Sequence, residues 1–278
     1  MKRAGNLAAK IAARDNIRLA FLKALRGKRS SSSALMFCRT VDKNLQEIQQ
    51  RLTAANPGWS GYTSFTISKP KPRIISAAPF AERIMHHAIM NVLEPVIERQ
   101  MICHTYACRK GKGTHAAVRY AFRKAKATGY YLKLDVCKYF DSIDHEVLKG
   151  QLAQIIKDQH TLRQLNLLID SYYTVAGKGL PIGNLTSQFF ANLYLSAMDQ
   201  YILEQLRPAA YVRYMDDFVL WDASLEKLSE LHAAIVAFCS ELLLLFLHEP
   251  LIGASADGIL LVRCNTHQWQ HAIRIAFP

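Results

Sequence analysis

The feature that most constrains this chain is a pair of adjacent aspartates inside an otherwise apolar stretch. Residues 210–221 read AYVRYMDDFVLW, two β-prone runs separated by Asp216 and Asp217. Two such runs with so short a link predict a β-hairpin that carries the acids at its turn. Tight hairpin turns favour Asn-Gly or Asp-Gly, so Asp-Asp breaks the local rule. A broken rule at this point indicates a functional demand on the two carboxylates.

Another aspartate ends a second predicted strand. Residues 130–136 read YYLKLDV, and this alternation predicts a strand that delivers Asp135 at its end. If the strand pairs with the hairpin, Asp135, Asp216 and Asp217 converge from elements distant in the sequence. Close carboxylates repel and raise one another's pKa unless a cation lies among them. Oxygen ligands without His or Cys suit Mg²⁺, and two such ions support in-line phosphoryl transfer. Acids on surface loops readily explain a lone Asp135, whereas an Asp pair flanked by hydrophobic strands is much harder to explain in this way.

The flanking pattern predicts an α+β fold, with helices packed on an antiparallel sheet. A hairpin is expected from Tyr62–Ile67 and Arg73–Ser76. One helix is expected to end near Pro95, and Asp144 is interpreted as a structural or helix-capping acid. Helices are expected over residues 6–26, 40–54, 80–97, 114–126, 144–172, 187–206 and 224–245.

Charge and cysteine usage narrow the class of protein. The formal net charge is +13, from 35 Lys and Arg against 22 Asp and Glu, and the excess is concentrated in residues 1–29, 69–73 and 109–126. Such a balance favours nucleic acid as a partner, although a solvated basic face explains the charge alone equally well. Six scattered cysteines without a CxxC pair predict reduced thiols and a cytoplasmic location. The basic N-terminus lacks a signal-peptide block and the leucine run 242–247 is too short to span a bilayer, so no membrane association is expected.

Two motifs together resemble those of reverse transcriptases. Residues 214–217 (YMDD) are similar to the YxDD motif, and residues 134–145 (LDVCKYFDSIDH) resemble the first palm motif of bacterial members. The resemblance covers roughly residues 6–250. It implies a right-hand polymerase fold with an N-terminal helical region (1–60), fingers (61–129), palm (130–250) and a divergent tail (251–278). It also implies an RNA-directed DNA polymerase that uses template RNA, primer, deoxynucleoside triphosphates and two Mg²⁺ ions at Asp135, Asp216 and Asp217.

The same resemblance implies nucleotide-binding and template contacts. Phe140, five residues after Asp135, matches an aromatic residue that blocks a ribose 2′-hydroxyl; a core phenylalanine is the alternative. Lys71 and Arg73 lie in a segment that resembles loops whose basic groups grip the triphosphate, and solvated surface charge is the alternative. Arg109 belongs to a further fingers-like motif and is expected to contact template or nucleotide phosphate.

Residues 179–188 (GLPIGNLTSQ) distinguish subgroups of the family. They resemble a loop that packs beside the nascent base pair, which assigns Ile182 and Gly183 to nucleotide binding. At the position of Ile182 most members carry Gln, and at the positions of Ser187 and Gln188 they carry Ser-Pro. The version here resembles the diversity-generating retroelement subgroup, which misincorporates opposite template adenines and pairs with a small, basic, helical accessory protein. A group II intron or retron enzyme is the alternative.

The C-terminal residues depart from the family pattern. Neither the hairpin motif nor the helical thumb that follows the palm is recognisable after residue 258, which favours a frameshift near Ile259. A frameshifted tail is expected not to pack on the palm. The alternative function is therefore a truncated, inactive protein that only binds nucleic acid, whereas the intact acids favour an active polymerase.

Overall fold

A computed structural model describes residues 3–68, 72–257, 259–263 and 272–275, with side chains described as far as Ala256 outside the 69–71 gap. The backbone forms two compact units. Unit 1 comprises Met1–Ile67, Arg73–Arg99 and Asp144–Phe190, and unit 2 comprises Ser68–Pro72, Gln100–Ile143 and Ala191–Pro278. The predicted α+β class is confirmed, because helices accompany an antiparallel sheet.

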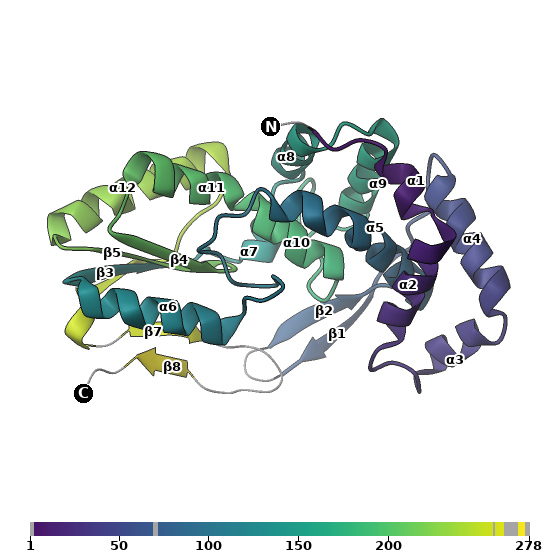
Figure 1. Ribbon diagram of the computed structural model, residues 1–278, viewed down its shortest axis with the longest axis horizontal. Helices are drawn as coiled ribbons and strands as arrows, with labels where there is room; N and C mark the ends of the chain where they lie inside the picture. The colour runs from purple at the N-terminus through teal and green to yellow at the C-terminus, as the bar shows by residue number, and fades with distance from the viewer. Residues whose placement is uncertain (1–2, 69–71, 258, 264–271, 276–278) are drawn as a thin grey trace. The chain divides into compact units, whose positions relative to one another are not determined.

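Unit 1 is helical apart from one hairpin (Figure 1). Its helices are α1 (Leu7–Ile11), α2 (Arg14–Leu25), α3 (Ser32–Cys38), α4 (Val41–Thr53), α5 (Phe80–Glu98), α8 (His145–Ile155) and α9 (Gln159–Asp170). Strands β1 (Thr63–Ile67) and β2 (Arg73–Ala77) pair antiparallel, which confirms the predicted hairpin. Helix α5 forms the centre of the unit, since Ile84, Met85 and Ile89 are fully buried and α2 packs along it. The predicted 80–97 helix is confirmed, and the buried Val96 and Ile97 carry it past Pro95 to Glu98.

Two long helices predicted in unit 1 are each divided near a polar side chain that bonds both to its own segment and to a distant one. The 6–26 helix divides into α1 and α2, where Asn16 Nδ2 donates to the carbonyl of Ile11 at 2.9 Å and to that of Ala88 at 2.9 Å. The 144–172 helix divides into α8 and α9 at Asp158, whose carboxylate accepts from Leu7 N–H at 2.8 Å and from the start of α9. Long-range capping of this kind leaves no signal in local periodicity. Asp144 caps α8 by accepting from two backbone N–H groups, as predicted.

Unit 2 is built on a four-stranded antiparallel sheet in the order β4–β5–β3–β6. These strands are β4 (Ala210–Tyr214), β5 (Asp217–Asp222), β3 (Tyr130–Leu134) and β6 (Leu251–Ala254). Helix α6 (Thr114–Ala127) covers one face, and α11 (Ser196–Tyr201) and α12 (Leu225–Leu242) cover the other (Figure 1). The remaining helices are α7 (Tyr139–Ser142) and α10 (Leu185–Tyr194), which ends in this unit. The predicted 187–206 helix is therefore interrupted, with α11 continuing into a π-helical turn at Ile202–Leu206.

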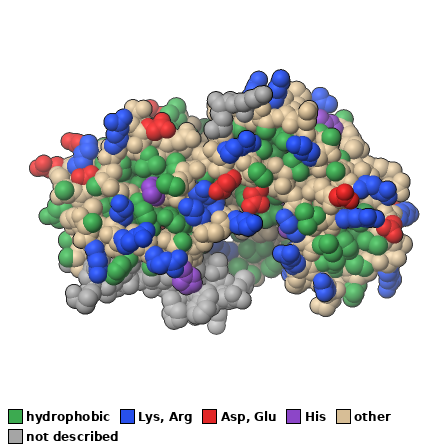
Figure 2. Space-filling view, in the orientation of Figure 1, with side chains coloured by type: hydrophobic (Ala, Val, Ile, Leu, Met, Phe, Trp, Pro, Cys, Tyr) green, Lys and Arg blue, Asp and Glu red, His purple; other side chains and the backbone are tan. Residues whose placement is uncertain are grey.

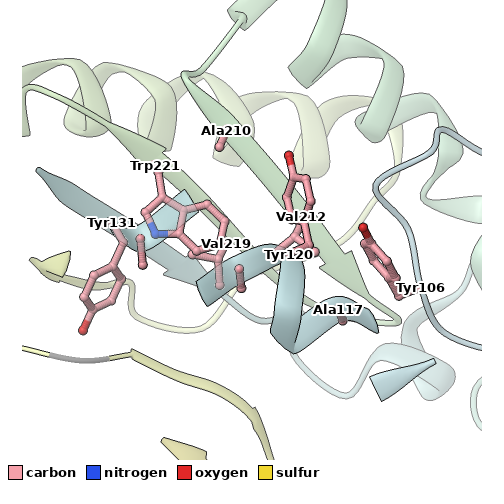
Figure 3. Close-up of a cluster of buried hydrophobic side chains, with 10 residues drawn as sticks. Tyr106, Ala117, Tyr120, Tyr131, Ala210, Val212, Val219 and Trp221 are labelled. Atoms are coloured by element: carbon pink, nitrogen blue, oxygen red, sulfur yellow. The ribbon is translucent and has the colours of Figure 1, made fainter. Parts of the chain in front are cut away.

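A buried cluster fixes α6 on the sheet (Figure 3). Tyr120 from α6 and Tyr106 from the preceding loop pack with Val212, Val219 and the fully buried Trp221 from the strands. These strand residues alternate with side chains of the opposite face, as a sheet covered on both sides requires. The hairpin that bears the two aspartates is therefore anchored in a dry core.

The C-terminal segment forms a separate two-stranded antiparallel sheet from β7 (Ile259–Arg263) and β8 (Ala272–Ile275). The backbone of both strands lies beside α6. Side chains beyond Ala256 are outside the described residues, so the expectation that this segment does not pack on the palm stays a prediction. Strand pairing satisfies the backbone groups of the segment whatever its side chains are. No helix in the described part of the chain is long and apolar enough to cross a membrane. Cys38, Cys103, Cys108, Cys137 and Cys239 are free thiols, and Cys264 lies outside the described residues.

Candidate active site

The strand register brings Asp135 and Asp217 to the same edge of the sheet. Leu134 pairs with Phe218 at the end of the β3–β5 ladder, and continuing that register places Asp135 opposite Asp217. Backbone pairing outside the ladder holds this end, because His248 N–H donates to the carbonyl of Asp135 at 2.9 Å. The predicted hairpin is confirmed, with Met215 and Asp216 forming its turn and Asp217 opening β5.

At this edge of the sheet, a lysine lies beside the pair of carboxylates. Burial raises the pKa of Asp135, the charge of Asp217 raises it further, and His248 and Lys133 act in the opposite direction. Lys133 Nζ lies 3.0 Å from Asp217 Oδ1. Among the described residues, no three or more His, Cys, Asp or Glu side chains are placed to hold one metal ion. A metal site built from all three carboxylates therefore stays a prediction, and Asp217 forms its ion pair with Lys133.

The donor chemistry nevertheless suits a divalent cation. Asp135 and Asp217 are half-buried and present only hard oxygen atoms, the ligands that Mg²⁺ prefers. Burial and a neighbouring carboxylate disfavour the ionised form of Asp135, and a divalent cation at that point would relieve both effects. Asp216 acts on a different neighbour, since its charge contributes, after burial, to raising the pKa of Tyr139.

Backbone strain marks the turn. Met215 has a φ of 60°, in the left-handed region that Asn, Asp or Gly usually occupies at the first central position of a two-residue hairpin. Arg213 Nη1 donates to the carbonyl of Met215 at 2.8 Å. A strained residue of this kind persists only where surrounding contacts determine it, and such positions cluster at functional sites.

A buried ion pair supports the turn from beneath. Arg213 and Asp199 are both 0% exposed and form a bidentate pair, with Nε to Oδ1 at 2.7 Å and Nη2 to Oδ2 at 2.5 Å. Burial alone would lower the pKa of Arg213, but the Asp199 charge raises it overall. Tyr211 donates to Asp199 Oδ1 at 2.7 Å, and Arg213 Nη1 also reaches Asn192 Oδ1 at 3.2 Å. Sequence reasoning missed this network, although an Arg in an apolar strand and an Asp in an apolar helix were visible signals.

The same arginine ties the hairpin to a preceding loop. Arg213 N–H donates to the carbonyl of His104, Tyr106 N–H donates to that of Arg213, and both distances are 3.0 Å. Arg109 Nη1 is engaged within that loop, with 2.8 Å to the carbonyl of Thr105. Arg109 therefore helps to shape the loop, and its contact with phosphate stays a prediction. Phe140 lies beside Tyr139 with ring centroids 5.8 Å apart.

In unit 1, the structure brings the Ile182–Gly183 loop against β2. Ser76 N–H donates to the carbonyl of Ile182 at 2.8 Å. Gly183 has a φ of +112°, and a Cβ atom there would lie 2.7 Å from Ile75 Cγ2. Exposed Arg73 begins the same strand, so these predicted nucleotide contacts share one local structure. Lys71 lies outside the described residues.

Comparisons with known proteins agree with this geometry. The family described as Reverse transcriptase (RNA-dependent DNA polymerase) matches residues 67–246. The chain is 24% identical over 168 residues to an uncharacterized 91 kDa protein in cob intron of Schizosaccharomyces pombe, covering 58% of this chain and 21% of that protein. It is 24% identical over 170 residues to the group II intron-encoded protein LtrA of Lactococcus lactis subsp. cremoris, covering 59% and 28%. The chain thus spans less than a third of the length of either relative.

A solved structure shows the same fold. Apo telomerase from Candida tropicalis aligns with a TM-score of 0.55 at 13% identity, covering 73% of this chain and 46% of that chain. At this identity the likeness concerns the fold, and it places the antiparallel sheet and its helices in a polymerase architecture.

Proposed function

Since the chain belongs to the reverse transcriptase (RNA-dependent DNA polymerase) family, we propose that it copies an RNA template into DNA. The observation that carries this proposal is the half-buried pair of Asp135 and Asp217 beside the strained turn that bears Asp216. These three carboxylates would hold Mg²⁺. When bound, two such ions supply activation of the attacking hydroxyl and neutralisation of charge on the transferred phosphoryl group.

The chain's own residues then bind and position the substrates. Arg73 and Lys71 are proposed to grip the triphosphate, because guanidinium and ammonium groups make charge-assisted contacts to phosphate. Phe140, held beside Tyr139, is proposed to exclude a ribose 2′-hydroxyl. The Arg213 network holds the backbone of the turn that carries Asp216 and leads into Asp217.

We also propose the partners and the location. Figure 2 shows Lys and Arg side chains spread over the visible face, and with a net charge of +13 this surface supports binding of template RNA and primer. Arg109 is a proposed phosphate contact, and a small, basic, helical accessory protein is a proposed partner. The free thiols agree with a proposed cytoplasmic location.

The finer proposal is a diversity-generating retroelement enzyme. It is supported by Ile182 and Gln188, where most family members carry Gln and Pro. The second candidate is a group II intron-encoded enzyme, which is favoured by the relatedness to LtrA. The two differ in where their cDNA errors fall, since only the first predicts errors concentrated opposite template adenines.

Primer extension on an RNA template tests the polymerase function. The parent chain should extend a DNA primer with deoxynucleotides in Mg²⁺. Asp216→Ala should abolish extension while the circular dichroism spectrum and unfolding midpoint stay close to those of the parent, because the residue lies in a turn. Asp15→Asn, an exposed acid on α2, is the matched control and should extend normally. Retained polymerisation by Asp216→Ala would refute the assignment.

A further inference from the structure

We propose that Lys133 is an internal counter-ion of the active site, which pairs with Asp217 and must release it when a divalent ion binds. Lys133 is then a positioning residue that weakens divalent-ion binding and reduces the repulsion between Asp135 and Asp217 when no ion is bound. The inference rests on the proposed function, because it takes Asp135 and Asp217 as ligands of the ion.

Strand geometry places the lysine beside both carboxylates. Lys133 and Asp135 are two residues apart at the end of β3, so their side chains leave the same face of the sheet. Lys133 pairs in register with Val219, which makes Asp217 its diagonal neighbour on β5. The ammonium lies 3.0 Å from Asp217 Oδ1 and its charge also acts on Asp135.

Burial makes this pair more than a surface contact. The side chains of Lys133 and Asp217 are 12% and 21% exposed, whereas the surface pair of Lys43 and Glu47 is 76% and 55% exposed. Water screens a shielded pair less, so the lysine charge is felt by any cation that approaches the carboxylates. A divalent ion bound to Asp217 would lie close to the Lys133 ammonium, and the two positive charges would repel each other. The lysine and the divalent ion therefore compete for the carboxylate.

Mn²⁺ binding without nucleotide or primer tests the proposal. Mn²⁺ would be added to the full chain and to each variant, and the concentration of free Mn²⁺ would be measured by electron paramagnetic resonance. Lys133→Met should bind Mn²⁺ about ten-fold more tightly than the parent, because it removes a positive charge beside the ion. Lys133→Gln should behave in the same way, and Lys133→Arg should keep the parent affinity.

Lys149→Met is the matched control. Lys149 is 17% exposed and pairs with Asp170 at 2.7 Å and with Glu146 at 2.9 Å, so its loss removes partly buried ion pairs of unit 1, whereas the three aspartates belong to unit 2. Its Mn²⁺ affinity should equal that of the parent. In thermal unfolding, Mn²⁺ should raise the midpoint of Lys133→Met and Lys133→Gln more than that of the parent, whereas a purely structural lysine would leave that increment unchanged.

The outcomes separate this inference from the function on which it rests. Equal or weaker Mn²⁺ binding by both uncharged variants, in a parent that extends primers, overturns the role of Lys133 and leaves the polymerase assignment standing. If the parent and the variants bind no Mn²⁺ and the parent extends no primer, both fail. The proposal is supported if Lys133→Met and Lys133→Gln bind Mn²⁺ more tightly than the parent while Lys133→Arg and Lys149→Met do not.

Discussion

Replacing Asp199 with Asn should lower the unfolding free energy of unit 2, because it leaves the buried guanidinium of Arg213 without its counter-charge. Arg213 and Asp199 are both 0% exposed, so solvent does not screen the lost charge. Removing one partner of a buried pair costs about 3–5 kcal/mol, a large share of the roughly 5–15 kcal/mol that separates folded from unfolded domains. Urea unfolding followed by circular dichroism should show this loss for Asp199→Asn. Glu47→Gln, which breaks an exposed pair, should change the unfolding free energy by less than about 1 kcal/mol.

The double variant Asp199→Asn/Arg213→Met separates stability from positioning. Removing both charges leaves no uncompensated ion, so much of the unfolding free energy should return. The carbonyl of Met215 still lacks its donor, so primer extension should remain about ten-fold or more below the parent. The reasoning is refuted if Asp199→Asn costs less than about 1 kcal/mol, or if the double variant recovers extension together with stability.

Three further predictions address other parts of the chain. Gly183→Ala should lower the unfolding free energy by about 1–3 kcal/mol in urea titrations, because its φ of +112° disfavours a side chain and the new Cβ meets Ile75; an unchanged midpoint would contradict this. Burial, followed by the charges of His87 and Arg83, lowers the pKa of His86 to about 3 from 6.5, so the unfolded chain binds the extra proton and stability should fall as pH drops from 6.5 towards 3. His86→Leu should reduce the dependence of the unfolding free energy on pH by the contribution of one bound proton. An unaltered pH dependence would argue against a buried neutral His86. Sequencing of cDNA from a defined RNA should show errors concentrated at template adenines, partly repaired by Ile182→Gln, whereas equal error at all four bases would defeat the diversity-generating proposal.

Local patterns predicted the elements that frame the site. The β4–β5 hairpin followed from two apolar runs around a short link, and the end of β3 followed from alternation that stops at Asp135. Each of these signals lies within about ten residues, where side-chain periodicity and turn chemistry decide the backbone. Pairing of the two motifs was expected, but the register opposite Asp217 and the fourth strand, β6, were not predicted.

Contacts between distant residues could not be predicted in the same way. At the breaks between α1 and α2 and between α8 and α9, Asn16 and Asp158 each bond to a residue far away in the chain as well as to a local one. The pairing of Lys133 with Asp217 likewise became visible only once the register was known. Side-chain charge alone did not show whether Asp217 faces a metal ion or a lysine. Tertiary contacts therefore decided the details on which the chemistry depends.

RNA-templated DNA synthesis by the full chain, compared with Asp135→Asn, tests the central claim most directly. Asn has nearly the same shape as Asp and removes only the charge. The account predicts deoxynucleotide incorporation on an RNA template by the parent, none by Asp135→Asn, and equal RNA binding by both. RNA binding without any incorporation by the parent would instead support a protein that only binds nucleic acid, and unchanged incorporation by Asp135→Asn would contradict the carboxylate site.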